Sequence, residues 1–250
     1  AKAEAELRRS NIEVATGICD IREPASIEAF VTLVGEKLGP ASILVNNAGG
    51  QFPTTAETVS TRGWEAVVRN NLNGTFFMTQ AVAQKHLIPK KRGRIVNVIA
   101  NIARGFPGMV HTGAARAGVE NMTKTLAIEW AQHNIQVNAI APGYFATEMN
   151  RALIDNAEFN AWVCKRTPAG RWGEPPEIAG LAVFLASRAA DYMTGQMVVM
   201  GSGDLSVAMR ASMAVPGAFS PVMLDGMVLS DGGMRDAQSM LDQAIVQGDP

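Results

Sequence analysis

The sequence predicts an α/β fold with a doubly wound parallel sheet. Short apolar runs rich in Val and Ile alternate with longer segments in which apolar residues follow helical spacing. Most of the apolar runs end in Asn, Gly or Pro. The chain has 250 residues, of which 47% are hydrophobic and 18% charged, as expected for a globular protein with a full core.

The first half of the chain is expected to alternate helices and strands. Apolar residues at helical spacing, such as Ile27, Phe30 and Val31, predict a helix after Pro24, and Gly39 ends it. A second apolar stripe runs through 61–84, where Asn71 interrupts it as either a solvent-facing or a functional residue. The expected elements are helices in 1–9, 27–38 and 61–84, and strands in 12–19, 43–47 and 93–100.

The second half continues the same alternation. A long amphipathic helix is expected over 112–132, followed by a strand over 135–140 that runs into Pro142 and Gly143. Pro175 lies at the start of a helix that extends through Leu185, because proline is favoured in a first helical turn. A last strand is expected over 197–200. No internal repeat interrupts this order.

Charge and cysteine content exclude several classes of protein. The formal net charge of -1 gives no electrostatic reason to expect nucleic acid or a membrane surface as a partner. Cys19 and Cys164 have neither metal-ligand nor redox-pair spacing, so we expect no metal site and a reducing compartment. The charged helix pattern of 1–9 does not resemble a signal peptide, so a cytoplasmic protein is expected.

The stretch from Ile43 to Gly50 changes from an apolar strand to a polar loop within a few residues. Asn46 and Asn47 place amide groups at the strand's carboxyl end, and Gly49 lets a ligand approach the backbone. Ligands bind at this edge in open α/β sheets. Asn and Gly are also common turn formers, so an ordinary turn remains an alternative.

The motif Asn46-Asn47-Ala48-Gly49 after a strand resembles the signature of the short-chain dehydrogenase/reductase family, and the resemblance extends over 1–200. It implies a Rossmann-like domain, a homo-oligomer and a nicotinamide cofactor, NADP being favoured over NAD. Asp20 and Thr147 fall on cofactor-contacting positions, although either could be a helix cap. The cofactor-binding residues that the resemblance implies are Asp20, Asn47, Ala48, Gly49, Arg116, Pro142, Gly143 and Thr147.

Family members begin with a strand, a T-G-x-x-x-G-x-G loop, a helix and a second strand, none of which the sequence contains. The backbone amides of that loop hold the cofactor's pyrophosphate. We therefore expect a domain over 1–200 that lacks its first β-α-β unit, in which the strand over 12–19 has no neighbour. An alternative is an inactive fragment that cannot bind the dinucleotide.

The family's catalytic Ser, Tyr and Lys align with Ala100, Thr112 and Arg116, while Asn71 falls on the motif whose Asn holds a water in the proton path. A Thr hydroxyl is a weak acid and an Arg does not deprotonate, so carbonyl reduction should be poor. Hydride addition to an enoyl thioester needs only stabilisation of an enolate. The run 105–118 resembles the trans-2-enoyl-CoA reductase branch. The expected protein is therefore an oxidoreductase acting on a small acyl-thioester or carbonyl substrate, with Asn71, Thr112 and Arg116 as catalytic residues.

Two ordinary interpretations compete with these assignments. Arg116, Glu120 and Lys124 are spaced for a salt-bridged solvent face. His111 could act near neutral pH, but a lone histidine is more often structural.

Residues 201–250 form an atypical tail, whose segment 201–235 resembles part of a patatin-like acyl hydrolase. Asp231 would be half of its Ser/Asp dyad, but the chain has no Gly-x-Ser-x-Gly turn to supply the nucleophile. An ester hydrolase is thus the least favoured function. The ordinary interpretation of this tail is a helix, a loop and an edge strand.

Overall fold

A computed structural model describes residues 2–103, 105–201, 222–224 and 227–229. The chain divides into two compact units. The first comprises 1–142 and 174–198, and the second comprises 143–173 and 199–250. None of the described helices combines the length and the apolar character needed to cross a bilayer.

The first unit holds β1, β2, β3 and the first half of β4, and the strand order of the sheet is β1-β2-β3-β4. The pairs β1–β2 and β2–β3 are parallel, and Asn46 lies beside Asn97, which lies beside Ala139. The carboxyl ends of three strands therefore meet at one edge, as the sequence predicts. The strands are β1 (Ile43–Asn46), β2 (Gly93–Val98), β3 (Ile135–Pro142) and β4 (Met197–Met200).

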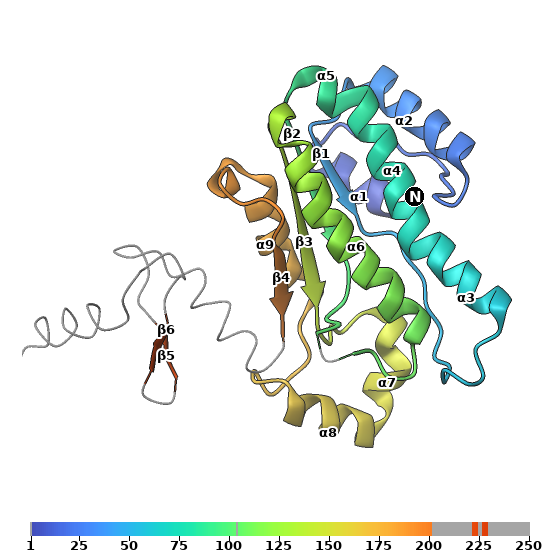
Figure 1. The fold of residues 1–250 in the computed structure, drawn as a ribbon, viewed down its shortest axis with the longest axis vertical. Helices are drawn as coiled ribbons and strands as arrows, with labels where there is room; N and C mark the ends of the chain where they lie inside the picture. The colour runs from blue at the N-terminus through green and yellow to red at the C-terminus, as the bar shows by residue number, and fades with distance from the viewer. Residues whose placement is uncertain (1, 104, 202–221, 225–226, 230–250) are drawn as a thin grey trace, which may run out of the picture. The chain divides into compact units, whose positions relative to one another are not determined.

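Helices cover both faces of the sheet in this unit. Figure 1 shows α4 and α6 on one face, with α2 beyond α4, and α9 on the other. Gly39 ends α2 with a φ of 77°, a left-handed conformation that favours glycine. The helices are α1 (Lys2–Arg9), α2 (Pro24–Leu38), α3 (Thr61–Val68), α4 (Gly74–Val82), α5 (Ile88–Lys90), α6 (Val110–Glu129) and α9 (Pro175–Ala186).

The predicted helix over 61–84 is interrupted by wider turns. Two π-helical segments, Arg69–Asn73 and Ala83–Leu87, separate α3, α4 and α5. Asn71 lies in the first of them and is buried rather than solvent-facing. Single π-turns occur frequently at functional sites, so this segment is a candidate part of the site.

A buried polar ladder links the sheet to its helices. The Asn46 side-chain amide donates to Asn97 Oδ1 and to Thr79 Oγ1 on α4, both at 2.8 Å, and Asn97 donates to Thr123 Oγ1 on α6 at 2.9 Å. Satisfied buried hydrogen bonds of this kind fix a unique arrangement. Asn46 is thus a structural member of the motif, while Asn47 is exposed at the strand tip.

Two expectations for the start of the sheet are wrong. Residues 12–19 form no strand, because no described strand lies beside them to accept their backbone hydrogen bonds. The apolar run 43–45, which in a doubly wound sheet is expected to be buried on both faces, has Ile43 and Val45 45% and 47% exposed.

The second unit carries a cluster of aromatic side chains. Tyr144 contacts Phe159, Trp162 and Trp172 edge to face, with ring centroids 5.7–6.2 Å apart. Phe159 and Trp162 also line a cavity of about 370 Å³. The regular elements in this unit are the 3₁₀ turn Glu148–Asn150, α7 (Arg151–Asp155), α8 (Ala157–Arg166) and the antiparallel hairpin of β5 (Val222–Leu224) and β6 (Met227–Leu229).

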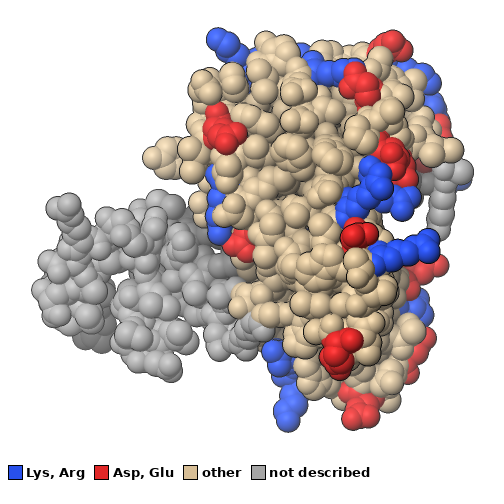
Figure 2. Space-filling model, turned by 45° about the vertical axis from the view of Figure 1, so that its right-hand side comes forward, with Lys and Arg blue, Asp and Glu red and all other residues tan. Residues whose placement is uncertain are grey.

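Charges are distributed without a large patch of one sign on the face seen in Figure 2, where Lys and Arg are interspersed with Asp and Glu among the described residues. The tail interpretation lies largely outside the described residues, and Asp231 lies outside them entirely.

Candidate functional site

A cleft of about 670 Å³ opens beside the carboxyl end of β1. Three segments of the first unit line it: residues 18–22 before α2, residues 48–52 after β1, and Ala66, Val67 and Asn70 around the end of α3. The structure therefore brings together three predicted cofactor residues, Asp20, Ala48 and Gly49. Asn47 lies next to them in the sequence but does not line the cleft.

Asn71 fixes the loop that forms one wall of this cleft. Its side-chain nitrogen donates to Gly50 O at 2.6 Å and to Val67 O at 3.1 Å, and its Oδ1 accepts the Gly50 N–H at 3.1 Å. Both backbone groups of Gly50 are thus held by one buried amide. The structure gives Asn71 a positioning role, and its predicted water-holding role stays a prediction.

Arg116 is a largely buried cation that makes no ion pair or hydrogen bond with any described residue. Removal from water lowers the pKa of its guanidinium to about 10. A Cβ atom added to Gly49 would lie 2.4 Å from Arg116 Nη2 and 2.7 Å from Asn71 Oδ1. Arg116, Asn71 and Gly49 are therefore packed together, and only glycine leaves room for the guanidinium.

The salt-bridge alternative applies to the other half of α6. Lys124 Nζ lies 2.6 Å from Glu120 Oε1, and both side chains are partly exposed. Arg116 does not join this pair. The i, i+4, i+8 interpretation is therefore confirmed for Glu120 and Lys124 and wrong for Arg116.

Thr112 is buried, and its hydroxyl faces a neighbour that the sequence did not indicate. His111 Nδ1 lies 3.2 Å from Thr112 Oγ1 and accepts the Thr112 backbone N–H at 2.7 Å. His111 is fully buried, and its Nε2 has no hydrogen-bond partner within the described part of the chain. A lone histidine carries no pattern, so only the three-dimensional neighbourhood identifies it.

Two backbone amides after Ala100 are engaged within the protein. The Asn101 N–H donates to Pro142 O at 3.1 Å, and the Ala103 N–H to Asn101 Oδ1 at 3.3 Å. These groups are already paired and are not free for a substrate oxygen.

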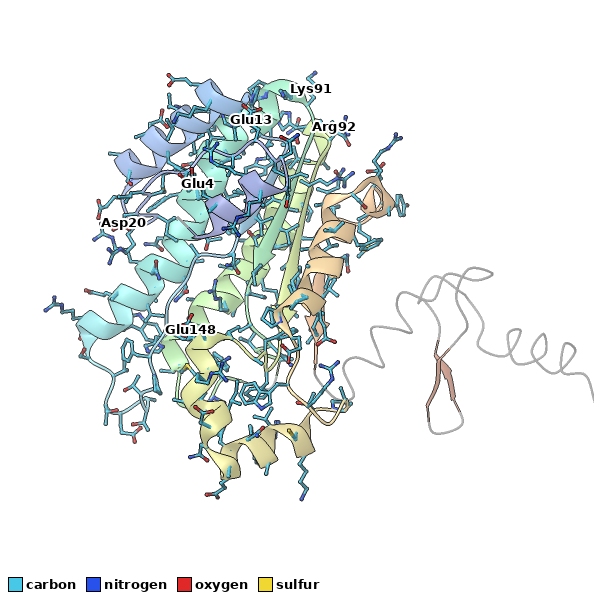
Figure 3. The ribbon with its side chains drawn as sticks, turned by 180° about the vertical axis from the view of Figure 1, so that it is seen from behind. Glu4, Glu13, Asp20, Lys91, Arg92 and Glu148 are labelled. Carbon is cyan, nitrogen blue, oxygen red and sulfur yellow. The ribbon has the colours of Figure 1, made fainter. Side chains whose placement is uncertain are left out.

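Asp20 lies in the loop that precedes α2 (Figure 3). Its carboxylate accepts the backbone N–H of Arg22 at 2.9 Å and forms an ion pair with the Arg22 guanidinium at 2.6 Å. Hydrogen bonds from Arg22 lower the pKa of Asp20 to about 2. Asp20 is thus ionised at the mouth of the cleft and forms a local turn rather than an N-cap.

The remaining predicted cofactor residues follow β3. Pro142 ends that strand in the first unit. Gly143 belongs to the second unit, where its N–H donates to Met200 O at 2.8 Å and an added Cβ would lie 2.8 Å from the same oxygen. Thr147 occupies the N-cap position of a short 3₁₀ turn, as the helix-cap alternative expects, but its side chain makes no capping bond. The cofactor roles of all three stay predictions.

Comparison with known proteins decides the family. The profile described as "Enoyl-(Acyl carrier protein) reductase" matches residues 1–203. The chain belongs to the short-chain dehydrogenase/reductase family. Its relatives there include the gluconate 5-dehydrogenase of Gluconobacter oxydans (strain 621H), 40% identical over 204 residues that cover 80% of this chain and 78% of the relative.

Two further relatives bear on the choice of branch. A Bacillus subtilis (strain 168) protein named "Probable 2,4-dienoyl-CoA reductase [(2E)-enoyl-CoA-producing]" is 38% identical over 202 residues, 80% of each chain. The gluconate 5-dehydrogenase from Burkholderia cenocepacia J2315, solved in complex with NADP and tartrate, is 38% identical with a TM-score of 0.78, and the match covers 82% of this chain and 81% of that one. The predicted family and Rossmann-like fold are therefore confirmed, whereas the predicted enoyl-CoA reductase branch is not.

The patatin-like interpretation of 201–235 gains no support from these comparisons, because the matched profile ends at residue 203.

Proposed function

We propose that this oxidoreductase binds a nicotinamide dinucleotide, with NADP favoured, and adds hydride to the double bond of an enoyl thioester. The NADP complex of the Burkholderia relative and the cleft lined by Asp20, Ala48 and Gly49 support the cofactor. The enoyl reductase profile and the dienoyl-CoA reductase relative support the substrate.

The residues of the cleft fit such a cofactor. Gly49 leaves its backbone accessible beside Arg116, as close approach of a ligand requires. The exposed tip Asn47, Ala48 and Gly49 and the ionised Asp20 would hold the adenosine side. Pro142, Gly143 and Thr147 are proposed for the nicotinamide end. When bound, the reduced nicotinamide supplies a hydride.

One observation carries the choice of substrate: the buried Arg116 cation has no anionic partner among the described residues, and neither Arg116 nor Thr112 can supply a proton. A carbonyl substrate needs an acid to protonate its alkoxide. In the enoyl reaction the β-carbon gains the hydride, the C=C electron pair moves toward the thioester oxygen, and the α-carbon then takes a proton from water. Arg116 stabilises the negative charge during this step.

Asn71 and Thr112 act through their neighbours in this mechanism. Asn71 holds Gly50 and thereby the loop against which Arg116 packs. Thr112 contacts His111 with both its hydroxyl and its backbone N–H. Both are proposed as positioning residues.

A second candidate function is oxidation or reduction of a hydroxy or keto acid. The gluconate 5-dehydrogenase relatives favour it, and an unpaired guanidinium suits a carboxylate ligand. In this case Arg116 would bind the carboxylate and the acid would have to come from another group.

Parallel assays distinguish these functions. We expect crotonyl-CoA to consume NADPH and 5-keto-gluconate to consume little. Arg116→Met should lower kcat/KM for crotonyl-CoA by about 100-fold or more. Lys124→Met is the matched control, because it removes a cation of the same helix that already pairs with Glu120. Turnover of the keto acid alone would replace the first function with the second.

Calorimetric titration with NADPH addresses the remaining alternative. Micromolar affinity is expected for the proposed enzyme, whereas absence of binding would favour an inactive fragment. Ester hydrolysis is tested with a p-nitrophenyl ester, for which the wild type should not exceed Asp231→Ala.

A further inference from the structure

His111 presents a buried hydrogen-bond donor for which the described residues provide no acceptor. Nδ1 lies 2.7 Å from the Thr112 backbone nitrogen, and an N–H can only donate, so Nδ1 accepts and carries no proton. The proton of the neutral ring therefore resides on Nε2. That atom is buried and has no partner among the described residues.

The structural role of His111 does not account for this second nitrogen. Accepting the Thr112 amide in the first turn of α6 requires one acceptor near the backbone, which an Asn side chain also supplies. An imidazole adds a distal N–H, and leaving such a group unpaired in a protein interior is unfavourable. A ligand atom that accepts this bond would explain why the group is there.

The imidazole lies behind the wall of the cleft. Its ring contacts Phe52 edge to face, with centroids 4.6 Å apart, and Phe52 is 40% exposed and lines the cleft. The Thr54 N–H donates to Gly108 O at 2.8 Å, which holds the Phe52 loop beside the loop that precedes α6. Phe52 is therefore a side chain that both contacts the His111 ring and lines the cleft.

The loop 49–52 also connects His111 with Arg116. Gly49 packs against the Arg116 guanidinium, and Phe52 packs against the His111 ring. One short loop thus contacts both the buried cation and the buried N–H.

We propose that His111 Nε2–H is the donor that binds the substrate's acyl oxygen when the Phe52 ring moves aside. This inference rests on the proposed enoyl-thioester function and names a further catalytic residue for it. The bond strengthens as the electron pair of the double bond moves toward that oxygen, and His111 keeps its proton throughout. The α-carbon receives its proton from water, and the carbonyl re-forms.

The matched variants His111→Asn and His111→Gln separate this role from the acceptance of the Thr112 amide by Nδ1, called the capping role below. Asn keeps an acceptor near the Nδ1 position but lacks the distal donor, whereas Gln places an amide N–H near the Nε2 position. With crotonyl-CoA and NADPH we expect kcat to fall by about 100- to 1,000-fold for Asn and by less than about 10-fold for Gln. The KM for NADPH should change little in both. A capping role alone predicts the opposite order.

Nuclear magnetic resonance of the wild type, labelled with ¹⁵N-histidine, tests the inference without any variant. The unliganded protein should show His111 protonated on Nε2 only, and saturating butanoyl-CoA should shift that nitrogen's resonance. A proton on Nδ1, or no shift at saturation, overturns the inference.

The activity measurements distinguish the two levels of proposal. A wild type that reduces no enoyl thioester overturns the proposed function and this inference together. An active wild type whose His111→Asn variant is equally active overturns only the inference.

Discussion

Replacing Arg116 with Met should stabilise the protein while removing its activity. The guanidinium is charged at neutral pH in the folded and unfolded states, but burial lowers its pKa to about 10 in the folded state. Each tenfold change in the acid dissociation constant corresponds to about 1.4 kcal/mol. The dissociation constant changes by more than a hundredfold here, so burying the charge costs about 3 kcal/mol. Partial contact with water reduces the expected gain to about 1–2 kcal/mol.

The sign of this effect follows from proton binding. Because the pKa of Arg116 is lowered in the folded state, the folded protein binds fewer protons than the unfolded chain only above about pH 10. The destabilisation from burying the charge is therefore fully present at neutral pH and is relieved as the pH rises through 10. Met removes the charge and retains a similar apolar stem, so the gain appears at neutral pH.

Urea unfolding measured beside thermal unfolding provides the assay. The Arg116→Met variant should show a higher midpoint with an unchanged m-value, and a melting temperature higher by about 2–8 °C. Arg94→Met is the control, because Arg94 pairs with Asp191 and its loss should destabilise by up to about 1 kcal/mol. Destabilisation of Arg116→Met by more than about 1 kcal/mol would show that the guanidinium has a stabilising partner and refute the reasoning.

Three other changes test the same structure. Gly49→Ala places a Cβ 2.4 Å from Arg116 Nη2, so the flexible guanidinium must move. We expect kcat/KM to fall by about 10-fold in the NADPH assay. Unchanged kinetics would show that Arg116 has no part in the reaction. Asn97→Leu breaks the buried polar ladder and should lower the free energy of unfolding by about 1–3 kcal/mol in urea; a neutral result would mean that water replaces the amide. Arg22→Gln should raise the pKa of Asp20 from about 2 toward the usual Asp range in a carboxylate NMR titration. The lowered pKa of Asp20 stabilises the folded state above the usual Asp range, and this stabilisation is lost as the pH falls toward 2. The variant should therefore unfold more readily in acid. An unchanged Asp20 pKa in the variant would show that the ion pair with Arg22 does not cause the lowering.

The sequence predicts the regular elements well where their pattern is local. The spacing of Ile27 and Val31 places α2 against the core, and the Val-rich run of β2 is buried in the sheet. Residues 12–19 have the composition of a strand, but a strand exists only beside a partner, which no composition can guarantee. Asn71 stands out in the sequence because it interrupts an apolar stripe, yet its hydrogen bonds to Gly50 join it to a loop distant in sequence.

In the candidate site too, the sequence identifies residues by their motif positions but not the contacts they make with residues distant in sequence. Motif positions identify Thr112 and Arg116, but orientation decides what they can do. Thr112 faces His111 because the two share the first turn of α6. Glu120 binds Lys124, and Arg116 has no ion-pair partner among the described residues. Phe52 and His111 were missed as partners, since no sequence spacing relates them.

The aromatic cluster around Tyr144 has a practical consequence. Trp162 and Trp172 are two of the four tryptophans, and Trp162 borders the small cavity of the second unit. Indole emission depends on the polarity and mobility of its surroundings, so this unit carries its own fluorescent reporter. Binding in that cavity is therefore expected to change the fluorescence emission of Trp162, independently of catalysis.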